Sequence, residues 1–439
     1  MHPKISLAEY QKRRKKFFDQ LTENSIAIIF GAPLRHKSAD QYYSYQPNNN
    51  LYYLTGYSEA EVVAVFIREA NNNKFILFNL PNNPLEEKWH GERTGQKGAQ
   101  EKFGADEAFD IARLKEKLSE WIISKTELFY TFGYDEAADN LIIEIFRQLK
   151  KKTRQGVVLP QKIIDVENII HEMRLIKSKE EIAVLRYAAE VTVMAHKAAM
   201  KLCKPNLYEY EIHACIMNTF FSHACQGSAY PNIVAGGSRG NILHYTENNR
   251  LLQQNELLLL DAGAAYEFYS ADVTCTYPVS GKFSPQQKAI YDLVLLAHDT
   301  ALALIKPGIA WHKMQEKIIR VLTQGLIDLE ILQGNLEQLI QSQAVLPFYM
   351  HGSGHWLGLD THDVSAYKIN QDWRLLEAGM VLTVEPGLYF SKAISGLAPQ
   401  WHDIAVRIED DVLVTETGYE ILSAGLPRTT EEIETFMAS

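Results

Sequence analysis

Three apolar runs in the second half of the sequence end in a carboxylate, and this pattern limits the folds that the chain can adopt. Residues 257–260 lead into Asp261, residues 380–384, apolar apart from Thr383, into Glu385, and residues 404–408, apolar apart from Arg407, into Glu409. Short apolar runs bounded by turn-forming residues are typical of buried strands. A buried carboxylate is costly without a charge partner. We therefore predict a sheet whose strand ends gather negative charge beside a positive partner.

A second aspartate, Asp272, follows Asp261 eleven residues later. The segment between them can turn, and a hairpin centred between Tyr266 and Glu267 would pair the two aspartates directly. Opposed residues have Cβ atoms ~5 Å apart, and two carboxylates at that distance repel each other unless a cation lies between them. A solvent-facing hairpin with two ordinary acids is the alternative, and the pair alone leaves both open.

A glycine-rich segment brings three histidines close together in the sequence: His351, His355 and His362. Gly352 and Gly354 separate the first two, and glycine disfavours a helix. We expect a loop that turns the imidazoles inward. The alternative is that these histidines are ordinary surface or core residues, which is the commoner explanation for two histidines at this spacing.

Four carboxylates and one imidazole form the candidate metal set: Asp261, Asp272, His355, Glu385 and Glu409. Such an oxygen-rich set favours Mn²⁺, and Zn²⁺ or Co²⁺ also suit it. Four carboxylates balance two divalent cations, and two such metals ~3.5–4 Å apart can share a hydroxide that attacks an amide. Arg407 shares a strand face with Glu409. It either offsets surplus negative charge there or forms an ordinary structural ion pair.

The chain of 439 residues is too long for one ordinary core, so two domains are expected. Residues 1–170 have a mixed α/β pattern. Residues 171–439 have an α+β pattern, in which helices cover a curved, largely antiparallel sheet. The expected helices are 7–21, 110–124, 135–150, 179–202, 208–224 and 285–304. The expected strands are 25–30, 61–68, 74–78 (joined to the previous one by a turn at residues 71–73), 256–260, 269–277, 380–385 and 404–409.

Composition narrows the class of protein. A net charge of −10 argues against nucleic acid as the main partner, because phosphate binding needs a basic face. No stretch approaches the ~20 apolar residues of a membrane span, and no signal core follows the N-terminus. The four cysteines show no paired spacing and are interpreted as reduced thiols, so we expect a cytoplasmic protein.

The order of the five candidate ligands resembles the pita-bread metallopeptidases, and the resemblance to aminopeptidase P is specific. Segments 38–40, 56–57, 171–174, 242–248, 351–363, 384–389 and 407–411 carry it, and it extends over nearly the whole chain. It implies an N-terminal aminopeptidase P domain followed by a catalytic pita-bread domain. The implied activity is release of the N-terminal residue from peptides with proline in second position, by a hydroxide that bridges two metals.

The resemblance also implies roles for individual side chains. His244 would stabilise the developing oxyanion, His362 would contact the substrate near the scissile bond, and His351 would support its loop and a proton relay. Glu385 would take the proton of the attacking water. Arg407 and Tyr389 would orient the metal site.

Further positions are implied as parts of the substrate pocket. These are Tyr230, Tyr367, Arg374 and Tyr389 from the catalytic domain, and Trp89 and Arg154 from the N-terminal domain of a neighbouring subunit. The last two require a homo-oligomer, a tetramer or a dimer. The chain departs from the family at His90, where an aromatic residue is usual, and over residues 401–406, where glycine is common. The second departure leaves His402 open as a metal ligand or a substrate contact.

Other functions, within this family and outside it, are alternatives to the aminopeptidase activity. A prolidase, which cleaves only Xaa-Pro dipeptides, would use the same ligands, and pocket depth would distinguish it. A methionine aminopeptidase does not need so large an N-terminal domain, and a creatinase-like hydrolase lacks the carboxylate set. A catalytically silent peptide-binding relative is a further class, but such proteins lose metal ligands that this sequence keeps.

Overall fold

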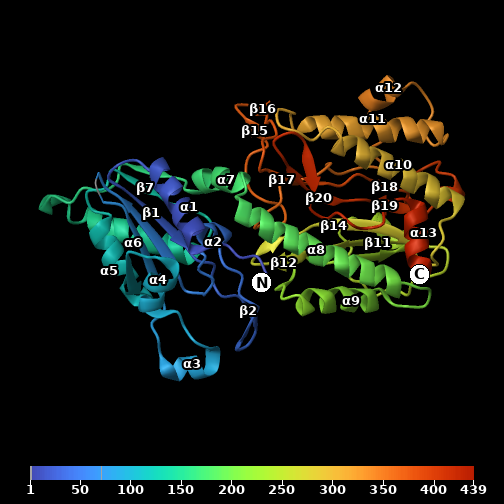
Figure 1. Cartoon of the computed structure of the whole chain (residues 1–439). Coiled ribbons are helices and arrows are strands. Elements are labelled where there is room, and N and C mark those ends of the chain that lie inside the picture. Colours follow the sequence, from blue (N-terminus) through green and yellow to red (C-terminus); the bar gives the residue numbers. More distant parts are fainter. Residues whose placement is uncertain (1, 71) are drawn as a thin grey trace. The chain divides into compact units, whose positions relative to one another are not determined.

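The computed structural model describes residues 2–70 and 72–439 (Figure 1). The chain forms two compact units: Ile5–Arg174, and Leu175–Ser439 together with residues 2–4. The two-domain organisation expected from the length is thus confirmed.

The N-terminal unit is built on a six-stranded mixed sheet with the order β6-β5-β4-β1-β7-β8. Its strands are β1 (Ser25–Phe30), β4 (Val63–Arg68), β5 (Lys74–Asn79), β6 (Glu107–Asp110), β7 (Glu127–Phe129) and β8 (Lys162–Ile164), and a separate hairpin holds β2 (His36–Ser38) and β3 (Gln41–Tyr42). The helices are α1 (Leu7–Gln20), α2 (Asn49–Thr55), α3 (Pro84–His90), α4 (Gly95–Phe103), α5 (Leu114–Trp121), α6 (Glu136–Lys150) and α7 (Glu167–Leu175). Strands β4 and β5 pair antiparallel, as predicted. The first residue of the turn predicted at 71–73 lies outside the described residues.

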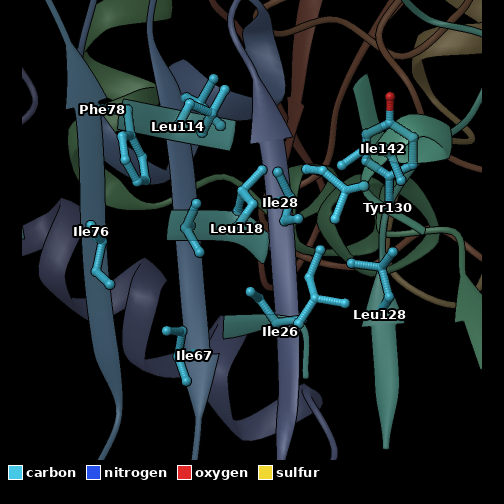
Figure 2. Packing of buried hydrophobic residues seen from close by; sticks show 14 of the residues in the cluster. Ile26, Ile28, Ile67, Ile76, Phe78, Leu114, Leu118, Leu128, Tyr130 and Ile142 are labelled. Carbon is cyan, nitrogen blue, oxygen red and sulfur yellow. The ribbon is translucent and has the colours of Figure 1, made fainter. Parts of the chain in front are cut away.

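Alternation along the strands separates two apolar layers in this unit. Ile26 and Ile28 of β1 point to the face covered by α5 and α6, where Leu118 is fully buried (Figure 2). On the other face, Phe17 of α1 packs edge-on against Phe66 of β4, with ring centroids 5.0 Å apart. The helix predicted over 110–124 is shorter, because β6 extends to Asp110, whose carboxylate accepts a hydrogen bond from the N–H of Ala112 and starts a 3-10 turn.

The C-terminal unit consists of several short antiparallel sheets flanked by helices. Its strands are β9 (Gly227–Ser228), β10 (Ile233–Gly236), β11 (Leu257–Ala262), β12 (Ala264–Tyr266), β13 (Tyr269–Ser270), β14 (Val273–Pro278), β15 (Lys368–Ile369), β16 (Asp372–Trp373), β17 (Val381–Val384), β18 (Gly387–Tyr389), β19 (Ala405–Arg407), β20 (Asp410–Val414) and β21 (Tyr419–Ile421). The helices are α8 (Lys179–Leu202), α9 (Glu209–Ser222), α10 (Pro285–Leu302), α11 (His312–Asp328), α12 (Leu336–Gln341) and α13 (Thr430–Ala438). Helix α8 packs on β11, β12 and β14, and α10 packs on β17, β18 and β19 (Figure 1). The predicted α+β class is confirmed.

Two predicted strands are interrupted where a site residue lies. The strand expected over 269–277 breaks between β13 and β14, because the N–H of Asp272 turns to the carboxylate of Asp411. The strand expected over 404–409 breaks between β19 and β20, where the N–H of Glu409 donates to the carbonyl of Thr274. Each break marks a change of pairing partner, which places a carboxylate where two small sheets meet.

The predicted hairpin register is wrong by two residues. Asp261 pairs with Thr274, and the turn lies at Glu267 and Phe268, which both have positive φ angles (48° and 62°). Because side chains alternate along a strand, a shift of two residues keeps Asp272 on the same face as Asp261. The two aspartates are therefore diagonal neighbours, and not directly opposed as predicted.

His196 of α8 provides a test of the core beneath this sheet. Burial lowers the pKa of its imidazole to about 4, against ~6.5 in an unfolded chain. As the pH falls below 6.5 the unfolded state binds the proton first. The stability from a neutral His196, about 3 kcal/mol, is therefore complete above pH 6.5 and declines toward pH 4. In metal-stripped protein, denaturant titrations should show the wild type losing more stability than His196→Gln between pH 7 and pH 4.5. A difference between the two that stays constant with pH would contradict this assignment.

Candidate active site

A cavity of about 590 Å³ opens in the C-terminal unit at the junction of the short sheets. Most of the predicted site residues line it: Tyr230, His244, Asp261, Asp272, His351, His355, His362, Glu385, Arg407 and Glu409. Residues from the loop before β10 and from the loop before β11, Pro231 and Leu243 among them, form an apolar part of the wall. One concave site thus joins carboxylates, imidazoles and an apolar surface.

The predicted metal ligands converge on one side of this cavity. Asp272, His355 and Glu409 each offer a ligand atom, and these atoms lie within 4.8 Å of one another. Nε2 of His355 is 3.3 Å from Oδ2 of Asp272 and 3.8 Å from Oε1 of Glu385. Asp261 lies at the end of β11, on the same face as Asp272. Sequence positions up to 148 residues apart, from 261 to 409, thus supply one cluster.

The hydroxyl of Tyr230 shows that this cluster needs additional positive charge. It lies 2.6 Å from Oδ1 of Asp261 and also 2.6 Å from Oδ1 of Asp272. A tyrosine has one hydrogen to donate, so it can satisfy only one of the two carboxylates. A divalent cation between the oxygens removes this conflict, and carboxylates with one imidazole are suitable ligands for it. The residues present therefore fit a divalent metal.

The pKa values of the cluster reflect burial among like charges. Burial raises the pKa of Asp261 despite the neighbouring Arg407, and Asp272 adds to the rise. The pKa of Glu385 rises to about 7, mainly through burial and against the effect of His355. Burial by itself lowers the pKa of His355, but Asp272 and Glu385 reverse this and raise it to about 9. Without cations the cluster would retain protons, whereas divalent cations would displace them.

A buried hydrogen-bond chain connects the cluster to His351. The guanidinium of Arg407 donates from Nη2 to Oδ2 of Asp261 (2.5 Å) and from Nη1 to the hydroxyl of Tyr389 (2.9 Å). Since that hydroxyl accepts from Arg407, it donates its own hydrogen to Nε2 of His351, 2.8 Å away. Nδ1 of His351 therefore carries the hydrogen and donates to the carbonyl of Gly352 (2.8 Å). Both ring nitrogens are occupied, and burial lowers the pKa of His351 to about 4, which keeps the ring neutral.

The glycine-rich loop orients His355 by pairing with β17. The N–H of His355 donates to the hydroxyl of Thr383 (3.1 Å), and the N–H of Thr383 donates to the carbonyl of His355 (2.9 Å). Nδ1 of His355 donates to the carbonyl of Trp356 (2.9 Å), which leaves Nε2 facing the carboxylates. The indole of Trp356 stacks on Tyr367 with an interplanar angle of 8°. The imidazole is therefore held in place by the pairing of its backbone with β17 and by the packing of the next residue, Trp356.

Several predicted pocket residues lie outside the cavity wall. Tyr367 supports Trp356, and its hydroxyl accepts from the N–H of that residue (3.1 Å). Arg374 is buried and donates from Nε to the carbonyl of Ala366. Tyr389 lies behind Arg407. Trp89 of α3 is 84% exposed and belongs, with Arg154, to the N-terminal unit. His402 contacts the carbonyl of Leu397 and does not line this cavity.

Two supporting residues were not singled out from the sequence. Asp411 is buried, and its carboxylate accepts the N–H of Asp272 at 3.1 and 3.2 Å. The hydroxyl of Thr274 donates to Glu409 (2.7 Å) and accepts from Nε of Arg407 (3.2 Å). Thr274 lies two positions after Asp272, so strand alternation was the signal that could have identified it.

The fold and the cluster together define the class: the chain belongs to metallopeptidase family M24, which matches residues 183–416. Residues 10–130 match the N-terminal domain of aminopeptidase P. The predicted family is thus confirmed. The part of the chain that the structure describes has no helix long and apolar enough to span a bilayer.

Individual relatives are similar over nearly the full length. The Xaa-Pro aminopeptidase of Escherichia coli (strain K12) is 41% identical over 436 residues, which cover 99% of this chain and 98% of that protein. Pseudomonas aeruginosa aminopeptidase PepP has a structure with a TM-score of 0.98 at 40% identity, covering 99% and 98% of the two chains. Zinc-substituted Escherichia coli aminopeptidase P in complex with product has a TM-score of 0.97 at 41% identity, covering 99% of each chain.

Gly354 offers a test of the loop that carries His355. A Cβ atom at this position would lie 2.0 Å from the carbonyl oxygen of Thr383, so Gly354→Ala must displace the loop from β17. We expect a loss of stability of about 1–3 kcal/mol and a fall in metal content measured by atomic emission. Gly352→Ala is the matched control, because its Cβ meets only the carbonyl of Gly354 at 3.9 Å. Equal effects of the two substitutions would argue against this pairing as the support of His355.

Proposed function

We propose that the chain is a metal-dependent Xaa-Pro aminopeptidase, a hydrolase that releases the first residue of peptides with proline in second position. The convergence of five metal-ligand candidates and three further histidines in one cavity carries this proposal. It is supported by similarity to Xaa-Pro aminopeptidases over 99% of the chain. The same similarity does not favour a prolidase.

The metal complement is proposed as two divalent cations, with Mn²⁺ preferred. Asp261, Asp272, His355, Glu385 and Glu409 would hold them. Four carboxylates match the charge of two such ions, and oxygen-rich sites suit Mn²⁺. When bound, divalent cations supply Lewis acidity, which acidifies a water molecule and polarises a peptide carbonyl.

The protein's own groups then divide the remaining tasks. The carboxylate of Glu385 takes a proton from the attacking water and passes it to the leaving nitrogen of proline. The imidazole of His244, on the cavity wall, donates to the carbonyl oxygen as negative charge develops there. The ring of His362 lies 4.3 Å from that of His355 and contacts the substrate beside the scissile bond. His351 keeps Tyr389 and Arg407 in place.

The apolar part of the wall suits the substrate's proline. Ala229, Pro231, Ile233 and Leu243 line the cavity and offer hydrocarbon surface to a pyrrolidine ring. The buried carboxylates offer a site for the free amino terminus, which would restrict cleavage to the first residue.

Oligomerisation and location complete the proposal. Trp89 is 84% exposed on a short helix without buried residues, a position suited to contact with a second subunit. A homo-tetramer or dimer in which Trp89 and Arg154 reach a neighbour's pocket is proposed on this basis. The four cysteines are free thiols in the structure, which is compatible with the cytoplasm.

A matched pair of peptides tests the activity. Metal-stripped enzyme should be inactive, and added Mn²⁺ should restore release of free Xaa from Xaa-Pro-Yaa, measured by chromatography of the products. An Xaa-Pro dipeptide is the comparison substrate. Cleavage of the dipeptide alone would identify a prolidase, and cleavage of neither would support a peptide-binding role.

Asp272→Asn tests the metal complement. The substitution removes one negative charge and one anionic ligand atom, so kcat should fall at least ~100-fold and bound metal per chain should decrease. Asp292→Asn, on the half-exposed side of α10, is the control and should change neither quantity. Full activity of Asp272→Asn in Mn²⁺-saturated buffer would sink the two-metal assignment.

A further inference from the structure

His244 lies in a loop, and only the residues next to it in the sequence hold it in place. Its side chain faces the cavity and is exposed, and within residues 2–70 and 72–439 its ring makes no hydrogen bond. The loop runs from the end of β10 to the start of β11 and begins with a 3-10 turn, Gly237–Asn241. The position of the imidazole therefore depends on whatever fixes the backbone on either side of it.

Glu209, in the first turn of α9, provides that fixation at three points. Its side chain is fully buried (0% exposed). Oε1 accepts the N–H of Gly236 (2.8 Å), at the start of the loop. Oε2 accepts the hydroxyl of Tyr245 (2.8 Å), the residue next to His244, and the N–H of Arg250 (2.8 Å), near the end of the loop. One carboxylate thus binds the beginning, the middle and the end of the loop.

The charge of Glu209 is essential to this arrangement. All three partners are donors, so the side chain must act only as an acceptor, which a carboxylate does and an amide cannot. The guanidinium of Arg250 closes the loop by donating from Nη1 to the carbonyl of Gly236 (2.9 Å). The ring of Tyr245 is 3% exposed, so the surrounding side chains leave it no room to move. A shift of His244 along with Tyr245 would therefore have to break the contact with Glu209.

We propose that Glu209 is a positioning residue for the hydrolysis, and that it holds His244 in place through Tyr245. The inference rests on the proposed role of His244 at the substrate carbonyl. A displacement of ~1 Å at a catalytic group can cost ~100-fold in rate. Glu209 does not line the cavity, so its effect must be transmitted through the loop.

Tyr245→Phe removes only the hydroxyl and keeps the ring, so it tests the link with little risk to folding. We expect kcat for Xaa-Pro-Yaa to fall about 10- to 100-fold, with KM and bound Mn²⁺ unchanged. Tyr130→Phe is the matched control: its buried hydroxyl donates to Asp139 (2.6 Å) in the N-terminal unit, and its loss should leave kcat unchanged.

Combination with His244→Ala separates positioning from general support. His244→Ala should itself lower kcat, and Tyr245→Phe should then cause no further loss, because there is no imidazole left to position. Multiplying losses in the double variant, or a normal kcat in Tyr245→Phe, would overturn the inference while leaving the proposed function intact. A normal kcat in His244→Ala would refute the inference together with the assigned role of His244. An inactive wild type would refute the proposed function itself, and the inference that depends on it.

Glu209→Gln provides a readout that does not depend on activity. Gly236 and Arg250 donate to different oxygens of Glu209, so the glutamine NH₂ group would face one of these two amides. At least one of the two amides should therefore exchange hydrogen at least ~10-fold faster, measured by mass spectrometry. Exchange in β14 should remain as in the wild type. Unchanged exchange at Gly236 and Arg250 would show that Glu209 does not fix the loop.

Discussion

Repulsion among buried carboxylates is the constraint around which the C-terminal unit is built. Asp261, Asp272 and Glu409 are each less than 10% exposed; the two aspartates come from the β11–β14 hairpin, and Glu409 lies at the break between β19 and β20. Folding brings together charges that the chain would otherwise keep apart. The guanidinium of Arg407 offsets part of this charge by its contact with Asp261. The remainder is what divalent cations balance, so metal binding and the stability of this region are coupled.

The supporting residues have a consistent chemistry. Thr274 joins Arg407 to Glu409 by accepting from one and donating to the other, and Tyr389 does the same between Arg407 and His351. Hydroxyl groups suit this position because they can donate and accept at once. They fix the orientation of the side chains on either side of them without adding charge to the site. The direction of each bond follows from the guanidinium, which can only donate.

The sequence predicted the ligand candidates better than the register that joins them. Apolar runs identified the strands, and their final residues indicated where acids would gather. The pairing of Asp261 with Asp272 failed because the turn lies at Glu267 and Phe268, and no turn-forming residue marks that site. The strand break at Asp272 could not be predicted from the sequence either, since it arises from a hydrogen bond to Asp411, 139 residues away in the sequence. Such tertiary contacts decide where a strand changes partner, and local pattern does not contain them.

The buried charges that hold the loops of His244 and His362 could not be predicted from the sequence, for a different reason. An acid in the first turn of a helix is favourable by itself, so Glu209 appears ordinary in the sequence although it is fully buried. Lys177, just before α8, likewise forms an ion pair of 3.0 Å with Asp363, and both side chains are 1% exposed. Asp363 directly follows His362, as Tyr245 directly follows His244. His244 and His362 thus each have a sequence neighbour that is held by a buried charge at the start of a helix, and this contact ties their loops to the rigid scaffold.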